Sequence, residues 1–365
     1  TTDPGNSNLQ SIATTMAQSY ATAAAAQNLV AKGTPQLVPA VPGMDFSLLG
    51  NPRITVTLQR TGLPLFFARM WGSRLASVSA TAVAEAYNPS YSQSGSTSFL
   101  PSAPKCVKPL LIPNGTNNAN SYVNTPTGSV TAPASAFLGK QIVFNSPCKP
   151  NGTGCQLPPG KKRLSQNEYL PMLTSTVHRY CPSCSGSSDF EQSIECCDGS
   201  TFAFKQCGTG GTVTSWDANV NPGGPGNSGG PLQSSLQCLM HVPNGAGQPD
   251  FLDASNLAAG TGPAQISPGS FNQSRYGLSS NALIGTSDSI ITVPLFDNAQ
   301  LDLQQPNHQV TIVGFLTVFI NDANAPNGNF SATILNVTGC GNSPSSAPAV
   351  SGGGVSAIPV RLIHN

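Results

Sequence analysis

The sequence contains very little charge. Charged residues make up 8% of the 365 residues, with 16 Lys and Arg against 15 Asp and Glu, so the formal net charge is +1. Because a typical soluble domain has about 25% charged residues, the polar surface here must consist mostly of Ser, Thr, Asn, Gln and Gly. The composition argues against a nucleic-acid partner, which requires a clustered Lys/Arg surface. A nearly neutral surface also has little self-repulsion and therefore permits self-association.

A long hydrophobic run and an initiator methionine are also lacking. No stretch of 18 apolar residues is present, so we expect no segment of this sequence to span a bilayer. The first residue is Thr1. We interpret this start as the removal of a leader or membrane anchor, or as the location of such an anchor upstream.

Cysteine, in contrast, is plentiful. There are ten cysteines, and seven of them lie between residues 148 and 207. In a chain with so little charge, an even number of cysteines favours a disulfide framework, which places the protein outside the cytosol. The sequence does not give the connectivity. The candidate residues are Cys106, Cys148, Cys155, Cys181, Cys184, Cys196, Cys197, Cys207, Cys238 and Cys340.

The N-terminal segment is predicted to be a long helix. Residues 7–32 are rich in Ala, with larger side chains at helical spacing, and Asn6 or Ser7 can cap the first turn. Gly33 follows as a C-terminal stop signal. A slim, Ala-rich helix suits close packing on a sheet or on a neighbouring helix.

Two alternating segments follow this helix. Residues 53–60 and 77–86 alternate apolar and polar side chains with period two, which predicts half-buried strands. Between them, Pro64 and Gly72 suit the start and the end of a short helix. The first 88 residues therefore predict an α+β portion in which a long helix lies on a small sheet.

The rest of the chain is predicted to be β-rich. A polar, Pro-rich break at 88–105 predicts a domain boundary, so we divide the chain into residues 1–88, 89–260 and 261–365. The middle region has short strand candidates in LLIPN, QIVFN and TFAFK, and we expect mostly loops stapled by disulfides there. The last region predicts a β-sandwich-like part, with the continuously apolar segment 310–320 as a central strand, 321–329 as a turn and 357–363 as a closing strand. The predicted class is mainly β.

Two stretches resemble one protein family. The segment ITVTLQRTGLPLFFARMWGSRLASVSATAVAEA is similar to the strand, PLFFARM and VSATAVAEA signature of bacterial TadE/TadG-like proteins, which accompany the Flp (tight-adherence) pilus machinery. The closing segments SDSIITVPLFDN, VTIVGFLTVFIND, TILNVTGCG and IPVRLIHN resemble the C-terminal part of long TadG-like members. The resemblance covers roughly residues 8–88 and 283–365. It implies a membrane helix, absent here, an exported body, and a role in pilus assembly or surface attachment. The family is not known for a catalytic centre.

One motif suggests hydrolytic chemistry. The segment GPGNSGGPL at 224–232 resembles the surroundings of the nucleophile in trypsin-like serine proteases. Ser228 would be the nucleophile, and the backbone N–H groups of Gly226 and Ser228 would form the oxyanion hole. The only upstream imidazole, His178, lies too close in sequence for a two-barrel fold. We therefore interpret the segment as a Gly-rich turn.

A second motif suggests a metal or redox site. The CPSC segment at 181–184, with Cys196-Cys197 and His178, contains ligand types that zinc accepts. Neighbouring cysteines point apart in an extended chain, however, and no thioredoxin-like context surrounds the CxxC. Structural disulfides are the favoured interpretation, and we predict neither a bound metal nor a cofactor.

The remaining polar motifs are weak. Asp322, Asn324 and Asn327-Gly328 resemble a calcium loop with its spacing off by one, and a hairpin turn explains them better. The acidic residues are too dispersed for a carboxylate pair. The other histidines are isolated in sequence, and the glycosylation sequons are best explained by the abundance of Asn, Ser and Thr, although glycosylation is testable. These histidines are His241, His308 and His364, and the sequons begin at Asn114, Asn151, Asn272, Asn329 and Asn336.

These observations predict a structural role and no enzyme activity. We expect an exported subunit of a bacterial pilus or extracellular filament, located on the cell surface or secreted, that acts through self-association or contacts with other pilus proteins. The helix at 7–32 and the strand at 357–363 are the first candidates for elements that copies exchange. The alternatives are a monomeric adhesin that binds a glycan or a host surface and, less favoured, a serine hydrolase acting through Ser228.

Overall fold

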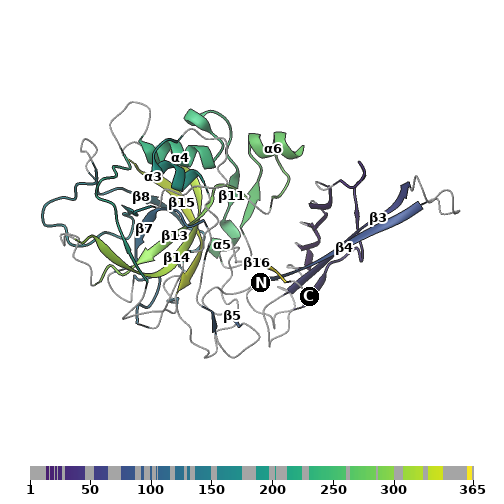
Figure 1. Cartoon of the computed structure of the whole chain (residues 1–365), viewed down its shortest axis with the longest axis horizontal. Coiled ribbons are helices and arrows are strands. Elements are labelled where there is room, and N and C mark those ends of the chain that lie inside the picture. The colour runs from purple at the N-terminus through teal and green to yellow at the C-terminus, as the bar shows by residue number, and fades with distance from the viewer. Residues whose placement is uncertain are drawn as a thin grey trace. The chain divides into compact units, whose positions relative to one another are not determined.

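The structure is a computed structural model of the whole chain, and it is mainly β, as predicted (Figure 1). It describes residues 14–15, 17–19, 21–22, 24–26, 29–45, 53–64, 75–86, 92–93, 99–100, 104, 106–115, 120–126, 130–131, 136–148, 154–174, 186–196, 202, 212–223, 230–259, 264–284, 287–299, 307–323, 328–339 and 360–363.

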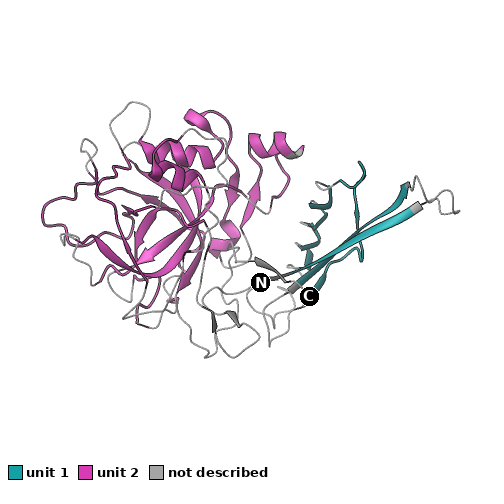
Figure 2. Cartoon of the chain, viewed as in Figure 1, with its two compact units in different colours: residues 1–88, 347–352, 358–365 teal, residues 89–346, 353–357 magenta. Residues whose placement is uncertain are grey.

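The chain divides into two compact units (Figure 2). Unit 1 contains residues 1–88 with two C-terminal pieces, 347–352 and 358–365, and unit 2 contains residues 89–346 and 353–357. The predicted boundary after residue 88 coincides with this division. The predicted boundary after residue 260 does not, because strands from both sides of it share one sheet. Unit 2 is therefore an insertion between the strands of unit 1.

Unit 1 contains a five-stranded sheet built on a long hairpin. β3 (Arg53–Pro64) pairs antiparallel with β4 (Leu75–Ala86), so both alternating segments form the predicted strands. β1 (Gln36–Leu37) and β2 (Gly43–Asp45) pair with β3, while β16 (Val360–Ile363) pairs with the end of β4. The closing strand thus belongs to the N-terminal sheet. The predicted short helix after Pro64 lies outside the described residues, apart from Pro64 itself, which ends β3.

The N-terminal helix is present but ends earlier than predicted. The described residues among 14–26 are helical, and among them Ala21 and Ala25, one turn apart, are buried. Val30 and Gly33 instead exchange backbone hydrogen bonds of 2.9 and 3.0 Å. Ala31 and Lys32 between them have positive φ angles of 49° and 61°. The prediction that the helix extends to Lys32 is therefore wrong, because a two-residue turn starts after Val30.

Unit 2 is organised around a seven-stranded mixed sheet. Its order is β8-β15-β14-β13-β7-β9, with β10 paired to β14, and only β13 and β7 run parallel. The predicted central strand is confirmed, because residues 312–320 of β14 are buried without interruption. The strands are β7 (Leu110–Pro113), β8 (Gln141–Phe144), β9 (Leu170–Pro171), β10 (Val213–Ser215), β13 (Ile290–Phe296), β14 (Gln309–Asp322) and β15 (Phe330–Gly339).

Two short helices cover one face of this sheet. α3 (Asp189–Glu195) and α4 (Pro231–Leu239) contribute Phe190, Leu232 and Leu236 to the largest apolar cluster, together with strand residues such as Leu316. Figure 1 shows both helices stacked over the strands. A second cluster on another part of the sheet surrounds Trp216 and the disulfide Cys148–Cys155. The middle region was predicted as stapled loops, whereas its strands β7–β10 join the seven-stranded sheet and its helices α3 and α4 contribute to the largest cluster.

Smaller elements complete the unit. A third apolar cluster lies under a two-stranded sheet and includes Leu252, Ile266 and Phe319. The described hairpin between β14 and β15 spans the predicted turn at 321–329. The additional elements are β5 (Ser92–Gln93), β6 (Phe99–Leu100), η2 (Pro243–Gly245), β11 (Phe251–Asp253), α5 (Ser255–Ala259), β12 (Gln265–Ser267) and α6 (Ser270–Tyr276).

Candidate functional site

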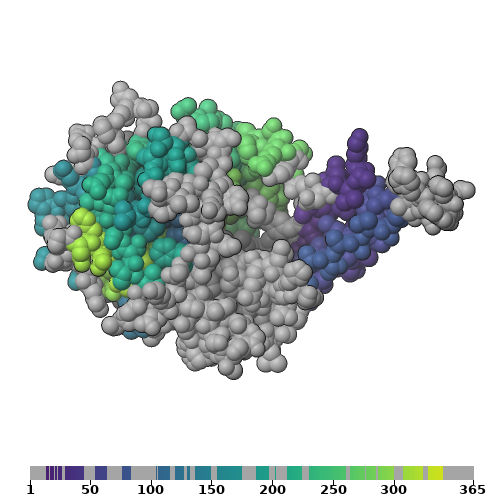
Figure 3. All heavy atoms as spheres, in the orientation of Figure 1, coloured from purple at the N-terminus to yellow at the C-terminus, as the bar shows by residue number. Residues whose placement is uncertain are grey.

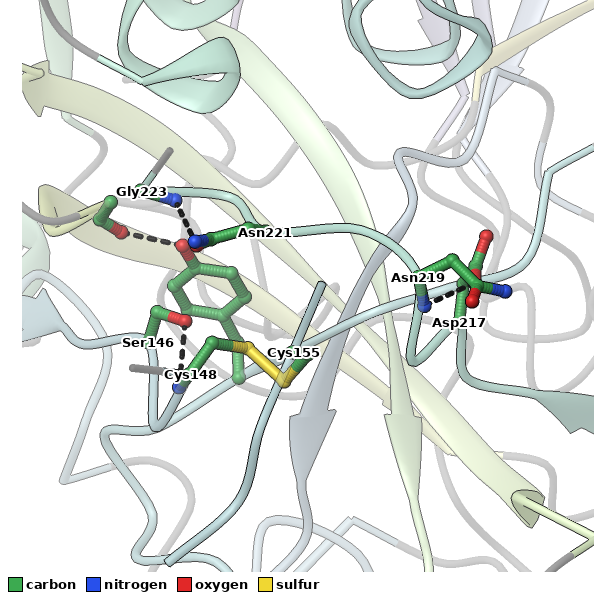
Figure 4. Close-up of a disulfide and its surroundings, with 9 residues drawn as sticks. Ser146, Cys148, Cys155, Asp217, Asn219, Asn221 and Gly223 are labelled. Atoms are coloured by element: carbon green, nitrogen blue, oxygen red, sulfur yellow. Dashed lines mark hydrogen bonds between the residues drawn. A yellow bond between two sulfur atoms is a disulfide. The ribbon is translucent and has the colours of Figure 1, made fainter. Parts of the chain in front are cut away.

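The disulfide Cys148–Cys155 closes a short loop after β8 (Figure 4). Its two cysteines are seven positions apart, their Cα atoms are 4.5 Å apart, and both side chains are buried. The hydroxyl oxygen of Ser146 accepts the N–H of Cys148 at 3.2 Å. The N–H of Cys155 donates to the carbonyl of Ala218 at 2.7 Å. The disulfide therefore closes the loop after β8, and the hydrogen bond from Cys155 to Ala218 joins that loop to the segment that follows β10.

This second segment is shaped by its own side chains. Asp217 and Asn221 each accept the backbone N–H two residues further on, at 2.8 and 3.1 Å (Figure 4). Gly154 lies against it with φ at 87°, and a Cβ at this position would lie 2.2 Å from the carbonyl oxygen of Ala218. Only glycine fits such a close approach with a positive φ. The site is thus a tightly packed junction of two loops.

Tyr169 lies beneath this junction and is fully buried. Its hydroxyl donates to the carbonyl of Gly328, in the turn before β15. Burial raises the pKa of this phenol far above its usual range. Tyr169 therefore acts as a neutral hydrogen-bond donor that links the disulfide region to the β14–β15 hairpin.

Every described cysteine is oxidised. Cys106, Cys196 and Cys238 are disulfide-bonded, as are Cys148 and Cys155. Since a disulfide sulfur is no thiolate, Cys196 is not available as a zinc ligand. The described residues hold no group of three or more His, Cys, Asp or Glu side chains that could bind a metal ion. The other predicted cysteines lie outside the described residues: Cys181, Cys184, Cys197, Cys207 and Cys340.

The protease-like motif is described only at its end. Ser228, Gly226 and His178 lie outside the described residues, so their geometry is not part of the structure. Gly230 is the N-cap of α4, and a Cβ there would lie 2.6 Å from the backbone of the 222–223 loop. Close packing at a helix start accounts for this glycine without catalysis. The hydrolase hypothesis stays a prediction.

A buried carboxyl group connects α3 to α4. Glu195 is 6% exposed, accepts the hydroxyl of Ser235 at 3.1 Å and accepts the N–H of Gly186 at 3.2 Å. Burial raises the pKa of Glu195, and these two hydrogen bonds oppose the shift. Nearby, the ammonium of Lys108 donates to the carbonyl of Cys196 at 2.8 Å. Sequence analysis missed Glu195, because the sequence reveals neither its burial nor its partner.

A carboxyl group with a strongly shifted pKa can mark an active site. Glu195, however, is enclosed by the packing of two helices, and its bonds go to Ser235 and to the backbone that precedes the capping box of Ser188 and Glu191. A group so enclosed cannot contact a substrate without opening the helix pair. We therefore assign Glu195 a structural role.

A partly exposed polar cluster in unit 2 surrounds Phe271 on α6. The imidazole of His241 stacks on the Phe271 ring with centroids 3.8 Å apart, and the Arg275 guanidinium lies 5.7 Å from the same ring. The Asp288 carboxylate accepts a hydrogen bond from Nε2 of His241 at 2.9 Å, and this bond lowers the pKa of the Asp288 carboxyl. Phe271 is 39% exposed, and the Asp288 side chain is 61% exposed. We call these four residues the Phe271 cluster.

A buried carboxylate anchors the Phe271 cluster. Asp250 accepts the N–H of Gly269 at 2.7 Å, both of its oxygens accept the amide of Asn272, and it accepts the hydroxyl of Ser287. These bonds hold the start of α6 next to the residue that precedes Asp288. The cluster is therefore supported by rigid backbone, which is a requirement for selective binding.

Most described sequons and histidines have structural contacts. Asn114 and Asn272 are buried and hydrogen-bonded, so neither amide is accessible to a glycosylating enzyme in the fold. The His308 ring lies 4.4 Å from that of Trp216. Asp322 is exposed, but the residues between it and Gly328 are outside the described part of the chain. Asn151 and His364 also lie outside it, while Asn329 and Asn336 are half-buried.

A second exposed feature is the outer edge of β4 in unit 1. Residues 77–82 are exposed, and Val78 is 52% exposed. Figure 3 shows the hairpin of β3 and β4, in blue, at the surface. Of the two strand neighbours of β4, β16 extends only along Val83–Ala86. Part of a strand edge is therefore accessible to another molecule.

Comparisons with protein-family models, with curated proteins and with solved structures gave no match to this chain. Among the helices formed by described residues, none is long and apolar enough to cross a membrane.

Proposed function

We propose that the protein is an exported structural or assembly subunit of a bacterial pilus or extracellular filament, and that it acts through protein–protein contacts. The observation that carries this proposal is the exposed, uncharged edge of β4 in the unit whose sequence resembles TadE/TadG-like proteins. Exposed strand edges are sites where another chain can add a strand. The partners would be further copies of the chain or other pilus proteins.

The disulfides support the proposed location. Disulfide bonds form and persist in oxidising environments such as the bacterial periplasm and the cell surface. Five described cysteines are oxidised, and Cys148–Cys155 closes a loop that contributes to a core cluster. Disulfide cross-links of this kind suit a subunit that must keep its fold outside the cell.

Electron microscopy of the source bacterium tests this function. Cells should bear filaments that an antibody against unit 2 labels, and deletion of the gene should remove the filaments or their surface attachment. Restoring the wild-type gene should restore both. Intact, unlabelled filaments in wild-type and deletion cells would contradict the proposal.

The Phe271 cluster favours a second candidate, a surface adhesin that binds a glycan. An exposed aromatic ring can stack on the C–H face of a sugar, while a carboxylate such as Asp288 can accept hydrogen bonds from its hydroxyls. Arg275 adds donors on the same surface. The cluster therefore combines the apolar and polar groups that a sugar-binding site needs.

A glycan array separates this candidate from a purely structural subunit. The full chain should bind a defined subset of glycans, and Phe271→Ala should lower that binding at least tenfold because the stacking surface is lost. Phe251→Ala is the matched control, since Phe251 is a 66% exposed phenylalanine on β11 outside the cluster. Equal loss in both variants, or no selective binding by the wild type, would exclude a glycan site at Phe271.

A further inference from the structure

The open part of the β4 edge ends where β16 begins to pair with it. β4 has twelve residues, of which β16 covers the last four, Val83–Ala86. Among the described residues, no strand pairs with the outer side of Leu75–Ala82. By contrast, the outer side of β3 is covered by β1 at Leu58 and Gln59 and by β2 near its start. The unit therefore shields one edge of its hairpin more fully than the other.

The register identifies the backbone groups that face outward. The carbonyl of Thr57 on β3 accepts the N–H of Val38 at 2.9 Å, so the backbone polar groups of Thr57 point away from β4. Thr57 is opposite Thr81, which makes them a non-hydrogen-bonded pair, and their hydroxyl oxygens are 2.8 Å apart as such pairs allow. The N–H and C=O of Thr81 consequently point outward. Because the direction of the backbone polar groups alternates along a strand, the N–H and C=O of Ser79, two residues before Thr81, also point outward.

The open segment is complementary to itself. One face of the strand has Ala76, Val78, Ala80 and Ala82, and the other has the hydroxyls of residues 77, 79 and 81. Antiparallel pairing of this segment with a second copy places alanine and valine opposite one another and hydroxyls opposite hydroxyls. Such matched pairs stabilise a sheet.

The open segment also lacks the features that protect natural edges. Residues 75–82 contain no charged residue and no proline, the two residue types that usually block edge pairing. The one charged residue of β4, Glu85, lies in the part that β16 covers. No like-charge repulsion therefore opposes the approach of an identical edge.

We propose that two copies of this chain associate by antiparallel pairing of their β4 edges about a two-fold axis near Ser79. Pairing centred there joins Ser79 to Ser79 and residue 77 to Thr81, all of which have outward-facing backbone groups in regular alternation. It extends over residues 76–82, so it fits between the β16 strands of the two copies. This inference rests on the proposed function: if the protein is a subunit that acts by protein–protein contacts, a second copy is its partner and the β4 edge is the contact surface.

Cross-linking of the full chain tests this pairing. Hydrogen-bonded residues opposite each other have Cα atoms about 5.5 Å apart, which is within disulfide range. Ser79→Cys should therefore give a covalent dimer under mild oxidation. Gln36→Cys, at an exposed position on β1 at the other edge of the same sheet, should give no covalent dimer, because the two Gln36 positions do not meet in this pairing. No cross-linking at Ser79, or equal cross-linking at Gln36, would overturn the proposal.

Proline substitution provides an independent test in sedimentation velocity over a concentration series. The wild type should show a reversible dimer, and Ser79→Pro should remain monomeric with an unchanged circular dichroism spectrum, since its outward N–H is not used within the hairpin. Ala80→Pro removes an N–H that faces β3 and should lower the stability of unit 1. A dimer that persists in Ser79→Pro, or a wild type that is monomeric throughout, overturns the edge pairing. In that case, filaments labelled by the antibody against unit 2 would still support the proposed function, because that experiment does not depend on pairing through β4.

Discussion

Asn114 is 1% exposed, and its side chain bonds three backbone groups of the loop after β7. Its carbonyl oxygen accepts the N–H groups of Tyr122 and Val123 at 2.9 and 3.1 Å, and its amide donates to the carbonyl of Val123 at 2.7 Å. Since buried groups without partners cost about 1–3 kcal/mol each, Asn114→Ala should lower the free energy of unfolding by roughly 2–3 kcal/mol.

Urea unfolding followed by fluorescence measures this loss. Asn167→Ala, at an exposed asparagine in the same unit, should change the stability by no more than about 0.5 kcal/mol. A similar effect of both substitutions would show that the Asn114 amide does not hold the loop.

Glu195 should make stability depend on pH. Because burial raises its pKa in the folded state, the unfolded chain loses the proton first, and ionisation in the fold is unfavourable. The stability of the wild type relative to Glu195→Gln should therefore be greatest at low pH. It should fall as the pH rises from the ordinary carboxyl range of about 4.3 through the raised folded value.

Thermal unfolding of both proteins from pH 4 to pH 8, about the range in which carboxyl groups and histidines titrate, measures this dependence. A constant difference between the two proteins across that range would contradict the assignment. So would a wild type that gains stability over Glu195→Gln as the pH rises.

The residues predicted from sequence were those whose chemistry is intrinsic. The even number of cysteines and the low charge of the chain predict disulfides, and Cys148 and Cys155 do form one. Glu195, Asp250 and Asn114 were not singled out for their structural roles, because those roles come from burial and from hydrogen-bond partners that the sequence does not identify. Asp250, for example, bonds residues 269, 272 and 287.

At the scale of elements, the long strands were predictable and the short helices were not. The apolar run in β14 is long enough that only a buried strand accommodates it between two turns. α3 has seven residues, yet its capping box of Ser188 and Glu191 is a readable start signal. α4 also has one, Pro231 in its first turn. Both signals were obscured by the Gly- and Cys-rich surroundings.

The disulfide loop gives a prediction at the same scale. Closing a loop of this length stabilises a fold by about 2–3 kcal/mol through the entropy of the unfolded chain. Replacing both Cys148 and Cys155 by Ala should therefore lower the stability of unit 2 by that amount, and the loss of buried sulfur contacts adds to it.

Guanidinium unfolding without reductant measures this change. The variant must be compared with the oxidised wild type, in which Cys106, Cys196 and Cys238 are also disulfide-bonded. An unchanged midpoint would mean that the loop is held by the bond from Cys155 to Ala218 and by packing alone.

At the scale of the whole molecule, the two compact units divide after residue 88, whereas strands on both sides of residue 260 share one sheet. The break after residue 88 is visible in composition. The sheet of unit 2 joins β7 and β8 to β13 and β15, and such distant pairings leave no local signal. For the same reason, β16 was predicted in the C-terminal domain although it pairs with β4.

Unit 2 should fold without unit 1. All three of its apolar clusters consist of residues between 107 and 337, so its core is complete without the N-terminal sheet. A fragment of residues 89–346 should show β-rich circular dichroism and one cooperative thermal transition. That transition should match a transition of the full chain to within about 3 °C, a shift of the size that 1 kcal/mol produces in a domain of roughly 250 residues. A fragment that lacks cooperative unfolding would show that the units depend on each other.

The pairing of β16 with β4 has a consequence for biosynthesis. A ribosome completes the β3–β4 hairpin long before it reaches residue 360, so the nascent N-terminal sheet must wait for its last strand while the insertion is made. During that interval the whole outer side of β4 offers unpaired backbone groups to chaperones and to neighbouring nascent chains. Val83–Ala86 can be covered only after Val360–Ile363 has been synthesised, long after the hairpin itself.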